Sequence, residues 1–249
     1  MSRLNSFHLP PDRWPGPEGE VLLEGTEAKH MLQVLRTPTG SVVRLFDGLG
    51  RDGLFELLPG GKKTARLRVQ HIAEHPRSQA GLTLALGWNK SSRRGWLLEK
   101  SVELCADGIA FWRAARSQGE PPLVKDSWQE KLIQSAKQCG NPWLPELACL
   151  SGGLDGLLAF GQGFTRRFLL WESSAASVLL RPSMISPGLC QGRCLAVLGP
   201  EGGLEPEEVD RLTRGGFEPV TLGKSVLRWE TAALHCLSLA FYGAQRAEN

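Results

Sequence analysis

The sequence predicts a small β domain followed by an α/β domain, whose mostly parallel sheet is covered by helices on both faces. In the first part, Arg66–Ile72 alternates polar and apolar residues, the pattern of a strand with one face in water. In the second part, continuous apolar runs such as Arg167–Trp171 and Cys194–Leu198 alternate with helical patterns, as in sheets buried on both faces. The stretch His75–Gly81 lies between the two parts and contains Pro, Ser and Gly, so we interpret it as a linker.

The first domain is expected over residues 1–76 as a β structure. Short runs rich in β-branched or aromatic residues are separated here by clusters of turn-forming residues. The strands that these runs predict are Ser41–Asp47, Gly53–Leu58 and Thr64–Glu74.

The second domain is expected over residues 80–249, where predicted strands and helices alternate along the chain. The predicted strands are Leu82–Trp88, Ile109–Arg113, Arg167–Trp171, Cys194–Leu198 and Pro219–Leu222. The predicted helices are Ser92–Asp107, Ser127–Gln138, Asp155–Phe160, Glu205–Gly215 and Thr231–Gln245. This order indicates helices that cross between parallel strands.

The composition indicates a globular intracellular protein. The chain is 41% hydrophobic and 22% charged, with a formal net charge of only +3. Basic residues outnumber acidic ones between Gly87 and Gly140; a phosphate-facing surface explains this, and a solvated helix face explains it nearly as well. We see neither a secretory signal nor an apolar stretch long enough to span a membrane. The six cysteines form no CxxC pair, so we expect reduced thiols in a cytoplasm.

Two short motifs suggest chemistry that their surroundings disfavour. Gly48–Gly53 fits the dinucleotide-binding pattern GxGxxG, but only Leu54–Leu58 follows before the next turn, and the motif needs a helix there. A glycine-rich hairpin turn is the better interpretation. His71–His75 fits the zinc-peptidase pattern HxxEH, but it continues an alternating strand and meets Pro76, which disfavours a helix. We therefore expect no metal site.

Three segments with polar or glycine-rich character follow predicted strands of the second domain. They are Trp171–Ser174, Gly199–Gly203 and Leu222–Ala232. Ligands of open α/β sheets bind beyond the carboxyl ends of the strands, so these segments predict a shared pocket. A purely structural interpretation stays open for each segment alone, because GPEGG is also a plain tight turn and Glu230 near a helix start also favours the helix dipole. Their occurrence together favours a binding site.

The same segments resemble a known family. Gly199–Gly203 (GPEGG) followed by Leu222–Ala232 (LGKSVLRWETA) is similar to the RsmE family of SPOUT methyltransferases, which methylate N3 of a uridine in small-subunit ribosomal RNA. Lys90–Arg93 and Lys100–Leu104 resemble the family's K-x-x-R and K-x-x-E-L segment, and Arg116–Ser117 fits its R-S pair. The resemblance covers most of the chain.

The resemblance implies a fold and a cofactor. The first domain would be a PUA-like β-barrel that helps to hold RNA. The second would be a SPOUT-type sheet with a deep trefoil knot, a rare exception to unknotted topology. The knot loops would bind S-adenosylmethionine, and the protein would be a homodimer that acts on 16S ribosomal RNA of the small ribosomal subunit.

Residue by residue, the resemblance assigns cofactor contacts to the three segments. The assigned residues are Glu172, Leu198, Gly199, Pro200, Glu201, Gly202, Gly203, Leu222, Gly223, Val226, Leu227, Arg228, Thr231 and Ala232. Arg228 is our candidate for stabilising negative charge on the uracil, and Glu230 is our candidate base. Trp229 stands where the family usually has Thr, and Asn141 follows Lys137–Gln138 where the family has an arginine-containing motif.

Basic residues provide the candidate RNA contacts. Arg3 and Phe7 resemble the family's basic N-terminal strand. The complete set of expected RNA-binding residues is Arg3, Lys90, Arg93, Arg94, Arg113 and Arg116. Two alternatives remain open: a SPOUT methyltransferase of a ribose 2′-hydroxyl or of transfer RNA, and a non-catalytic RNA-binding protein of ribosome assembly. A class I methyltransferase that uses Asp47–Gly53 is disfavoured by the missing helix.

Overall fold

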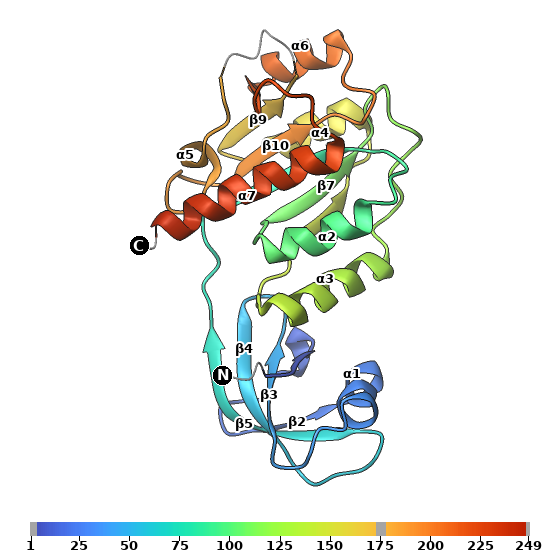
Figure 1. The fold of residues 1–249 in the computed structure, drawn as a ribbon, viewed down its shortest axis with the longest axis vertical. Coiled ribbons are helices and arrows are strands. Elements are labelled where there is room, and N and C mark those ends of the chain that lie inside the picture. The colour runs from blue at the N-terminus through green and yellow to red at the C-terminus, as the bar shows by residue number, and fades with distance from the viewer. Residues whose placement is uncertain (1–3, 173–177, 248–249) are drawn as a thin grey trace. The chain divides into compact units, whose positions relative to one another are not determined.

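The computed structural model describes residues 4–172 and 178–247, and its contacts group them into two compact units. The first unit comprises Met1–Arg77 with Ile133–Leu144, and the second comprises Ser78–Leu132 with Pro145–Asn249. Each unit contains its own sheet (Figure 1). Among the described helices, none combines the length and the apolar character that a membrane span requires.

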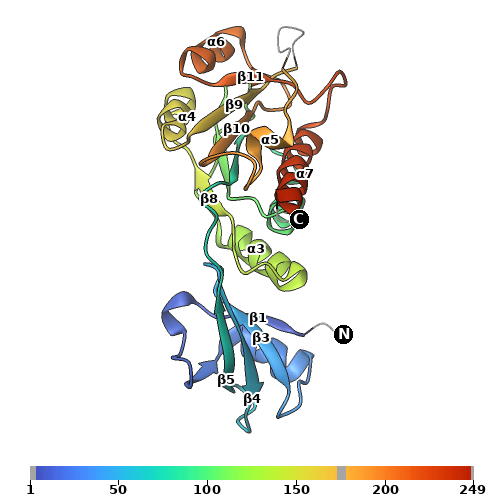
Figure 2. The same cartoon turned by 90° about the vertical axis from the view of Figure 1, so that its left-hand side faces the viewer.

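The first unit contains a curled five-stranded sheet in the order β1-β3-β4-β5-β2 (Figure 2). Its strands are β1 Ser6–His8, β2 Glu20–Leu23, β3 Val42–Phe46, β4 Arg51–Leu57 and β5 Ala65–Glu74. Strand β5 alternates between buried and exposed residues from Ala65 to Gln70, as its sequence predicts. The buried side chains contribute to one core with Phe7, Leu45 and Phe55.

Several elements of the first unit were not predicted. They are β2, α1 Gly25–Lys29, the π-helix η2 His30–Val34 and the 3-10 helix η1 Pro11–Arg13. The N-terminal strand that the resemblance implies at Phe7 is β1. Strand β1 has three residues and pairs in parallel with β3. Because so short a segment shows no periodicity, its strand conformation depends on the partner strand and on the burial of Phe7.

The GxGxxG motif forms a hairpin turn between β3 and β4, as predicted. The buried Asp47 carboxylate accepts hydrogen bonds from the backbone N–H groups of Leu49 and Arg51, at 2.7 and 3.0 Å. Gly48 and Gly50 have φ angles of +79° and +95°, which side chains rarely adopt. The motif therefore shapes a turn, and the segment that follows it is strand β4 rather than a helix.

The second unit contains a six-stranded parallel sheet in the order β11-β9-β10-β6-β7-β8. Its strands are β6 Leu82–Gly87, β7 Gly108–Trp112, β8 Glu146–Cys149, β9 Arg166–Leu170, β10 Cys194–Leu198 and β11 Glu218–Val220. Every residue of β6, β7 and β10 is buried, which confirms the prediction from the continuous apolar runs. Strand β8 was not predicted, because its four residues are only partly buried and carry no strong pattern.

Helices cover both faces of this sheet. The helices of the second unit are α2 Arg94–Glu103, α4 Gly153–Gly161, α5 Pro182–Ile185, α6 Pro206–Arg214 and α7 Trp229–Ala247. Helix α3 Asp126–Cys139 spans the division between the units, since its residues from Ile133 onward group with the first unit. Helices α2 and α7 lie on one face, and α4 and α6 lie on the other (Figures 1 and 2). On the second face, Leu157 of α4 and Leu212 of α6 join a core with Trp112 and Leu195.

Candidate active site

The carboxyl ends of three parallel strands lie next to one another in the second unit. Leu198 at the end of β10 pairs with Leu170 at the end of β9, and Leu170 in turn pairs with Val220 at the end of β11. Because neighbouring parallel strands end at the same edge, the segments that follow them meet there. These segments are the β9 loop (described here for Trp171 and Glu172), the β10 loop (Gly199–Glu205) and the β11 loop (Thr221–Arg228).

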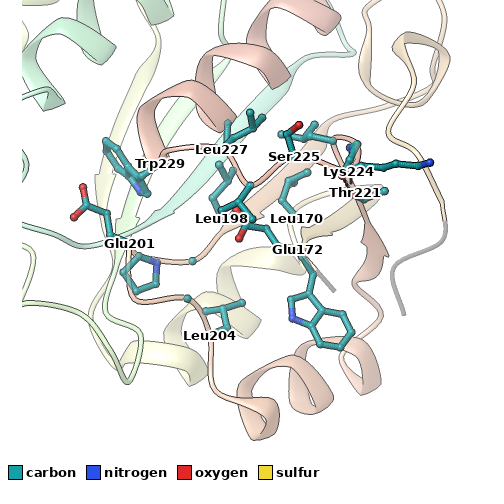
Figure 3. A pocket seen from close by; sticks show the side chains of 18 of the residues that line it. Leu170, Glu172, Leu198, Glu201, Leu204, Thr221, Lys224, Ser225, Leu227 and Trp229 are labelled. Carbon is teal, nitrogen blue, oxygen red and sulfur yellow. Dashed lines mark hydrogen bonds between the residues drawn. The ribbon is translucent and has the colours of Figure 1, made fainter. Parts of the chain in front are cut away.

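A pocket of about 980 Å³ lies between the three loops. In Figure 3, Leu170 and Leu198 lie in the middle of the pocket, with Lys224 and Leu227 on one side and Leu204 on the other. Its lining residues are Leu170, Trp171, Glu172, Leu179, Leu198, Gly199, Pro200, Glu201, Gly202, Gly203, Leu204, Thr221, Leu222, Gly223, Lys224, Ser225, Val226, Leu227, Trp229 and Ala232. The walls are mainly apolar side chains and glycine backbone.

The structure brings most of the sequence-predicted ligand residues to this pocket. Those that line it are Glu172, Leu198, Gly199, Pro200, Glu201, Gly202, Gly203, Leu222, Gly223, Val226, Leu227 and Ala232. Arg228, Glu230 and Thr231 lie at the start of α7 but do not line it.

Some lining residues were not predicted. Trp171, Lys224 and Ser225 lie within the predicted segments but were not among the assigned cofactor contacts, and Leu170 directly precedes the first segment. Leu179 comes from elsewhere in the chain and carries no sequence signal. An isolated β-bridge joins it to Thr221, and backbone hydrogen bonds join its neighbours Val178 and Leu180 to the same residue.

Glycines let the β10 loop pass close to its neighbours. A Cβ atom on Gly87, the last residue of β6, would lie 2.4 Å from the backbone nitrogen of Pro200, so only glycine permits this approach. The Gly203 N–H donates to the Pro200 carbonyl at 2.8 Å, and Gly203 has a φ of +74°. The sequence predicted the turn but did not identify Gly87 as its partner.

The β10 loop is fixed to helix α6 and to the segment after β7. Glu205 and Glu208 form a capping box at the start of α6. The Glu208 carboxylate also accepts a hydrogen bond from the Ala115 N–H at 2.8 Å. Arg116 donates to the Glu205 carboxylate at 2.8 Å and to the Gly202 carbonyl at 3.0 Å. These contacts hold the GPEGG turn in place before any ligand binds.

The β11 loop is shaped by its own hydrogen bonds. The Thr221 hydroxyl donates to the Gly223 carbonyl at 2.9 Å and accepts from the Gly223 N–H at 3.2 Å. Gly223 has a φ of +124°, so a side chain there would strain the backbone. The Ala232 N–H donates to the Arg228 carbonyl at 2.9 Å, which starts helix α7 directly after the loop.

Polar groups of the pocket lack partners within the described part of the chain. Glu172, Glu201 and Lys224 form no hydrogen bond or ion pair with another described residue. Trp229 is 5% exposed, and its indole N–H is buried without an acceptor among the described residues. A buried donor without an acceptor costs about 1–3 kcal/mol. The pocket therefore offers two carboxylates and an ammonium group to a ligand, and its wall contains Trp229, whose indole N–H is buried.

The predicted RNA-binding arginines differ in their surroundings. Lys90 and Arg93 are exposed, in the loop between β6 and α2. Arg94 is instead enclosed by aromatic rings: its guanidinium carbon lies 3.8 Å from the ring centre of Trp88 and 5.7 Å from those of Phe111 and Trp128. Burial lowers the pKa of Arg94 from its ordinary value. Packing thus gives Arg94 a role in the interior, which the sequence did not reveal.

The other three predicted RNA-binding residues also have distinct positions. Arg113 forms an exposed ion pair with Glu120. Arg116 braces the GPEGG turn, and its hydrogen bond to Glu205 raises the pKa of the guanidinium. Arg3 lies outside the described residues. Of the predicted RNA-binding residues that the structure describes, Lys90 and Arg93 are therefore the exposed cations that form no ion pair with another described residue.

Comparison with protein families matches both units. An RNA methyltransferase domain model matches residues 76–240, and an RNA methyltransferase PUA domain model matches residues 23–70. The chain is 28% identical over 228 residues to the ribosomal RNA small subunit methyltransferase E of Bacillus subtilis (strain 168), covering 88% of this chain and 89% of the relative. It is 27% identical over 233 residues to the enzyme of the same name from Mycobacterium bovis, covering 89% and 86%.

Solved structures agree with these matches. A methyltransferase of Legionella pneumophila in complex with the cofactor SAM is 26% identical with a TM-score of 0.79, covering 96% of this chain and 97% of that one. A ribosomal RNA small subunit methyltransferase E of Neisseria gonorrhoeae bound to S-adenosyl methionine is 26% identical with a TM-score of 0.77, covering 95% and 96%. By its sequence, its fold and its pocket-forming loops, the chain belongs to the RNA methyltransferase family.

Proposed function

We propose that this protein transfers a methyl group from S-adenosylmethionine to N3 of a uridine in 16S ribosomal RNA of the small ribosomal subunit. The observation that carries the proposal is the convergence of three strand-end loops around one pocket. The relatives that share this chain's length and fold are named small-subunit ribosomal RNA methyltransferases, and two structural neighbours contain the methyl donor.

The pocket fits S-adenosylmethionine in size and chemistry. Its volume of about 980 Å³ lies at the upper end of the range for small-molecule sites and leaves room beyond the cofactor. Leu170, Leu198 and Leu227 offer apolar surface to an adenine ring, and the glycines of the β10 loop let backbone approach the ligand. The unpaired carboxylates of Glu172 and Glu201 suit a ligand with ribose hydroxyls and cationic groups. The buried Trp229 N–H supports the same fit, since a bound ligand could supply its missing acceptor.

When bound, S-adenosylmethionine supplies an electrophilic methyl group attached to a sulfonium. Uridine N3 carries a proton, so the site must remove that proton or stabilise the anion that results. In our proposal, Arg228 stabilises negative charge on the uracil oxygens, because guanidinium remains charged and donates in a planar fork. Glu230, two residues later at the start of α7, accepts the proton.

The proposal includes the assembly expected from the family. Residues 1–76 form a PUA-like domain that helps to hold RNA, and residues 80–249 form the catalytic domain, whose pocket loops belong to a trefoil knot. Two copies form a homodimer in the cytoplasm. Lys90 and Arg93 contact phosphates, which supply affinity without reading sequence.

The decisive experiment combines binding with product identification. Calorimetry of the full chain with S-adenosylmethionine should show one site per chain. Incubation with small subunits that lack the modification, followed by digestion and mass spectrometry, should yield 3-methyluridine. Methylation of a ribose 2′-hydroxyl or of transfer RNA would replace the substrate, and absence of cofactor binding would leave a non-catalytic RNA-binding protein.

The role of Arg228 is tested separately. Arg228→Ala should lower the rate of methyl transfer at saturating RNA, while cofactor affinity changes little. Arg214→Ala is a matched control, because Arg214 is an exposed arginine of α6 that pairs only with Asp210. Unchanged turnover of Arg228→Ala would remove this residue from the chemistry.

A further inference from the structure

Two cysteine thiols lie next to each other at the amino end of strand β10, the end opposite the pocket. Cys194 is the first residue of β10, and Cys190 belongs to the turn between α5 and β10. Their Sγ atoms are 3.6 Å apart, and both cysteines are reduced. A disulfide requires about 2.0 Å between the sulfurs, so the two atoms must approach by about 1.6 Å.

The turn around Cys190 is built from glycines in unusual conformations. Gly188 and Gly192 have φ angles of +78° and +72°, and they flank Cys190 on both sides. The Cys190 N–H donates to the Ser186 carbonyl at 3.0 Å, which holds the thiol on the side of β10. The geometry therefore brings the two sulfurs together by a specific turn rather than by a continuous helix or strand.

The two thiols differ in access. Cys194 is fully buried, whereas Cys190 is only partly buried. Burial, reinforced by the neighbouring Cys190 thiol, raises the pKa of Cys194 to about 12. The thiolate is the reactive form of cysteine, so Cys194 stays protonated and shielded at neutral pH. A reagent in solution must react first at Cys190.

We propose that Cys190 and Cys194 form a dithiol modification site, which is oxidised to a disulfide by low-molecular-weight disulfides such as oxidised glutathione. The Cys190 thiolate attacks one sulfur of the small disulfide, forms a mixed disulfide and releases one thiolate, which takes up a proton from solvent. Cys194 then loses its proton as its sulfur attacks Cys190 Sγ, and the second small thiol leaves with a proton. Two protein thiols are oxidised and one small disulfide is reduced to two thiols.

The buried position of Cys194 predicts the time course. Formation of its thiolate is unfavourable, so the second step is slower than the first and the mixed disulfide accumulates transiently. The product ties the α5–β10 turn to the strand. Ser186, which anchors this turn, also donates its hydroxyl to the Leu239 carbonyl of α7 at 3.2 Å. We expect slower backbone hydrogen exchange in this turn after oxidation, and unchanged cofactor affinity.

The test uses the reduced full chain with Cys105→Ser and Cys139→Ser, which remove two exposed thiols that would also react. After incubation with oxidised glutathione, mass spectrometry should show a transient glutathione adduct and then loss of two hydrogens. Trypsin cleaves after Arg193, so the disulfide should join two separate peptides, one with each cysteine.

Two variants decide the order of the steps. Cys194→Ser should stop at a stable glutathione adduct on Cys190. Cys190→Ser should leave Cys194 unmodified for as long as the protein remains folded. The proposal is overturned if Cys190 keeps glutathione in the presence of Cys194, if Cys190 does not react, or if Cys194 reacts directly in Cys190→Ser. No outcome of this test depends on RNA or cofactor. A negative result would therefore overturn the dithiol site without bearing on the proposed methyltransferase activity.

Discussion

Both sheets of the molecule bury apolar side chains, but their strands pair in different directions. In the first unit all strand pairs except β1–β3 are antiparallel, and the β3–β4 and β4–β5 loops only close hairpins. In the second unit all strands are parallel, so their carboxyl ends share one edge. The Gly48–Gly53 turn and the Gly199–Gly203 turn illustrate the difference: both are rich in glycine, but the first closes a hairpin and the second lines the pocket described above.

Parallel pairing therefore concentrates function at one edge, whereas antiparallel pairing distributes loops between two. A disruption at the pocket edge should affect ligand binding strongly. A disruption in the first unit should affect stability and leave cofactor binding intact.

Gly87→Ala should abolish cofactor binding. The new Cβ would lie 2.4 Å from the backbone of Pro200, which must move and take the GPEGG turn with it. We expect the dissociation constant for S-adenosylmethionine to rise at least about 100-fold, or roughly 2.7 kcal/mol, measured by calorimetry. Gly61→Ala in the first unit is the control, because a Cβ there meets nothing within 4 Å. Equal affinity of the two variants would contradict the model of the pocket edge.

Glu27→Gln should destabilise the first unit. Glu27 forms an ion pair with Lys137 and accepts a hydrogen bond from the His8 N–H at 3.1 Å, and the Lys137 side chain is only 9% exposed. Leaving this ammonium group without its counter-charge should lower the free energy of unfolding by about 2 kcal/mol, less than for a fully buried pair. Urea unfolding measures the loss, and Glu24→Gln, in an exposed pair with Arg13, should change little. If folded Glu27→Gln also lost cofactor affinity, the first unit would not be independent of the pocket, contrary to our expectation.

Trp229→Phe should weaken cofactor affinity moderately. Phenylalanine keeps most of the ring but removes the buried N–H, which has no acceptor among the described residues. If a ligand supplies the acceptor, the loss is about 1 kcal/mol, or roughly fivefold in the dissociation constant. Trp171→Phe tests another tryptophan of the same pocket. Unchanged affinity of Trp229→Phe would show that the ligand does not use this donor.

Lys90→Ala and Arg93→Ala should each reduce the salt dependence of RNA binding. Both side chains are exposed, and each phosphate contact removed lowers the slope of log affinity against log salt by about 1. Arg94→Met should leave the slope unchanged, because the Arg94 guanidinium lies among Trp88, Phe111 and Trp128. If only Arg94→Met changed the slope of log affinity against log salt, the phosphate contact would belong to Arg94 rather than to Lys90 and Arg93.

The smallest effect is expected from His8 of the first unit. Burial lowers the pKa of His8 below its ordinary value of 6.5, with an opposing contribution from its hydrogen bond to the Asp47 carbonyl. The unfolded chain therefore binds this proton more readily, so stability is complete above about pH 6.5 and decreases as the pH falls below it. His8→Phe should lose less stability between pH 7.5 and 5.5 than the wild type does, in urea unfolding. An identical pH dependence would exclude a contribution from His8.

Much of the fold and site could be predicted from local patterns. The alternation in Arg66–Ile72 identified β5, and the run Cys194–Leu198 gave the bounds of β10. Some short strands were not predicted from local patterns, because their conformation depends on partners distant in sequence: β2 pairs with β5, and β8 pairs with β7. The prediction that Arg94 contacts RNA did not foresee its aromatic surroundings for a similar reason, since the residues next to it in sequence do not reveal the rings around it.

The sequence by itself determined which segments are strands buried on both faces, where glycine-rich turns follow them, and which family they resemble. These features depend on side-chain period and backbone freedom, which are local properties. Only the tertiary structure decided that Gly87 must lack a side chain beneath Pro200, that Arg116 braces Gly202, and that Cys190 lies beside Cys194. Each of these is a contact between residues of separate segments. The distance between the two residues is fixed by strand order and turn geometry rather than by the local sequence pattern.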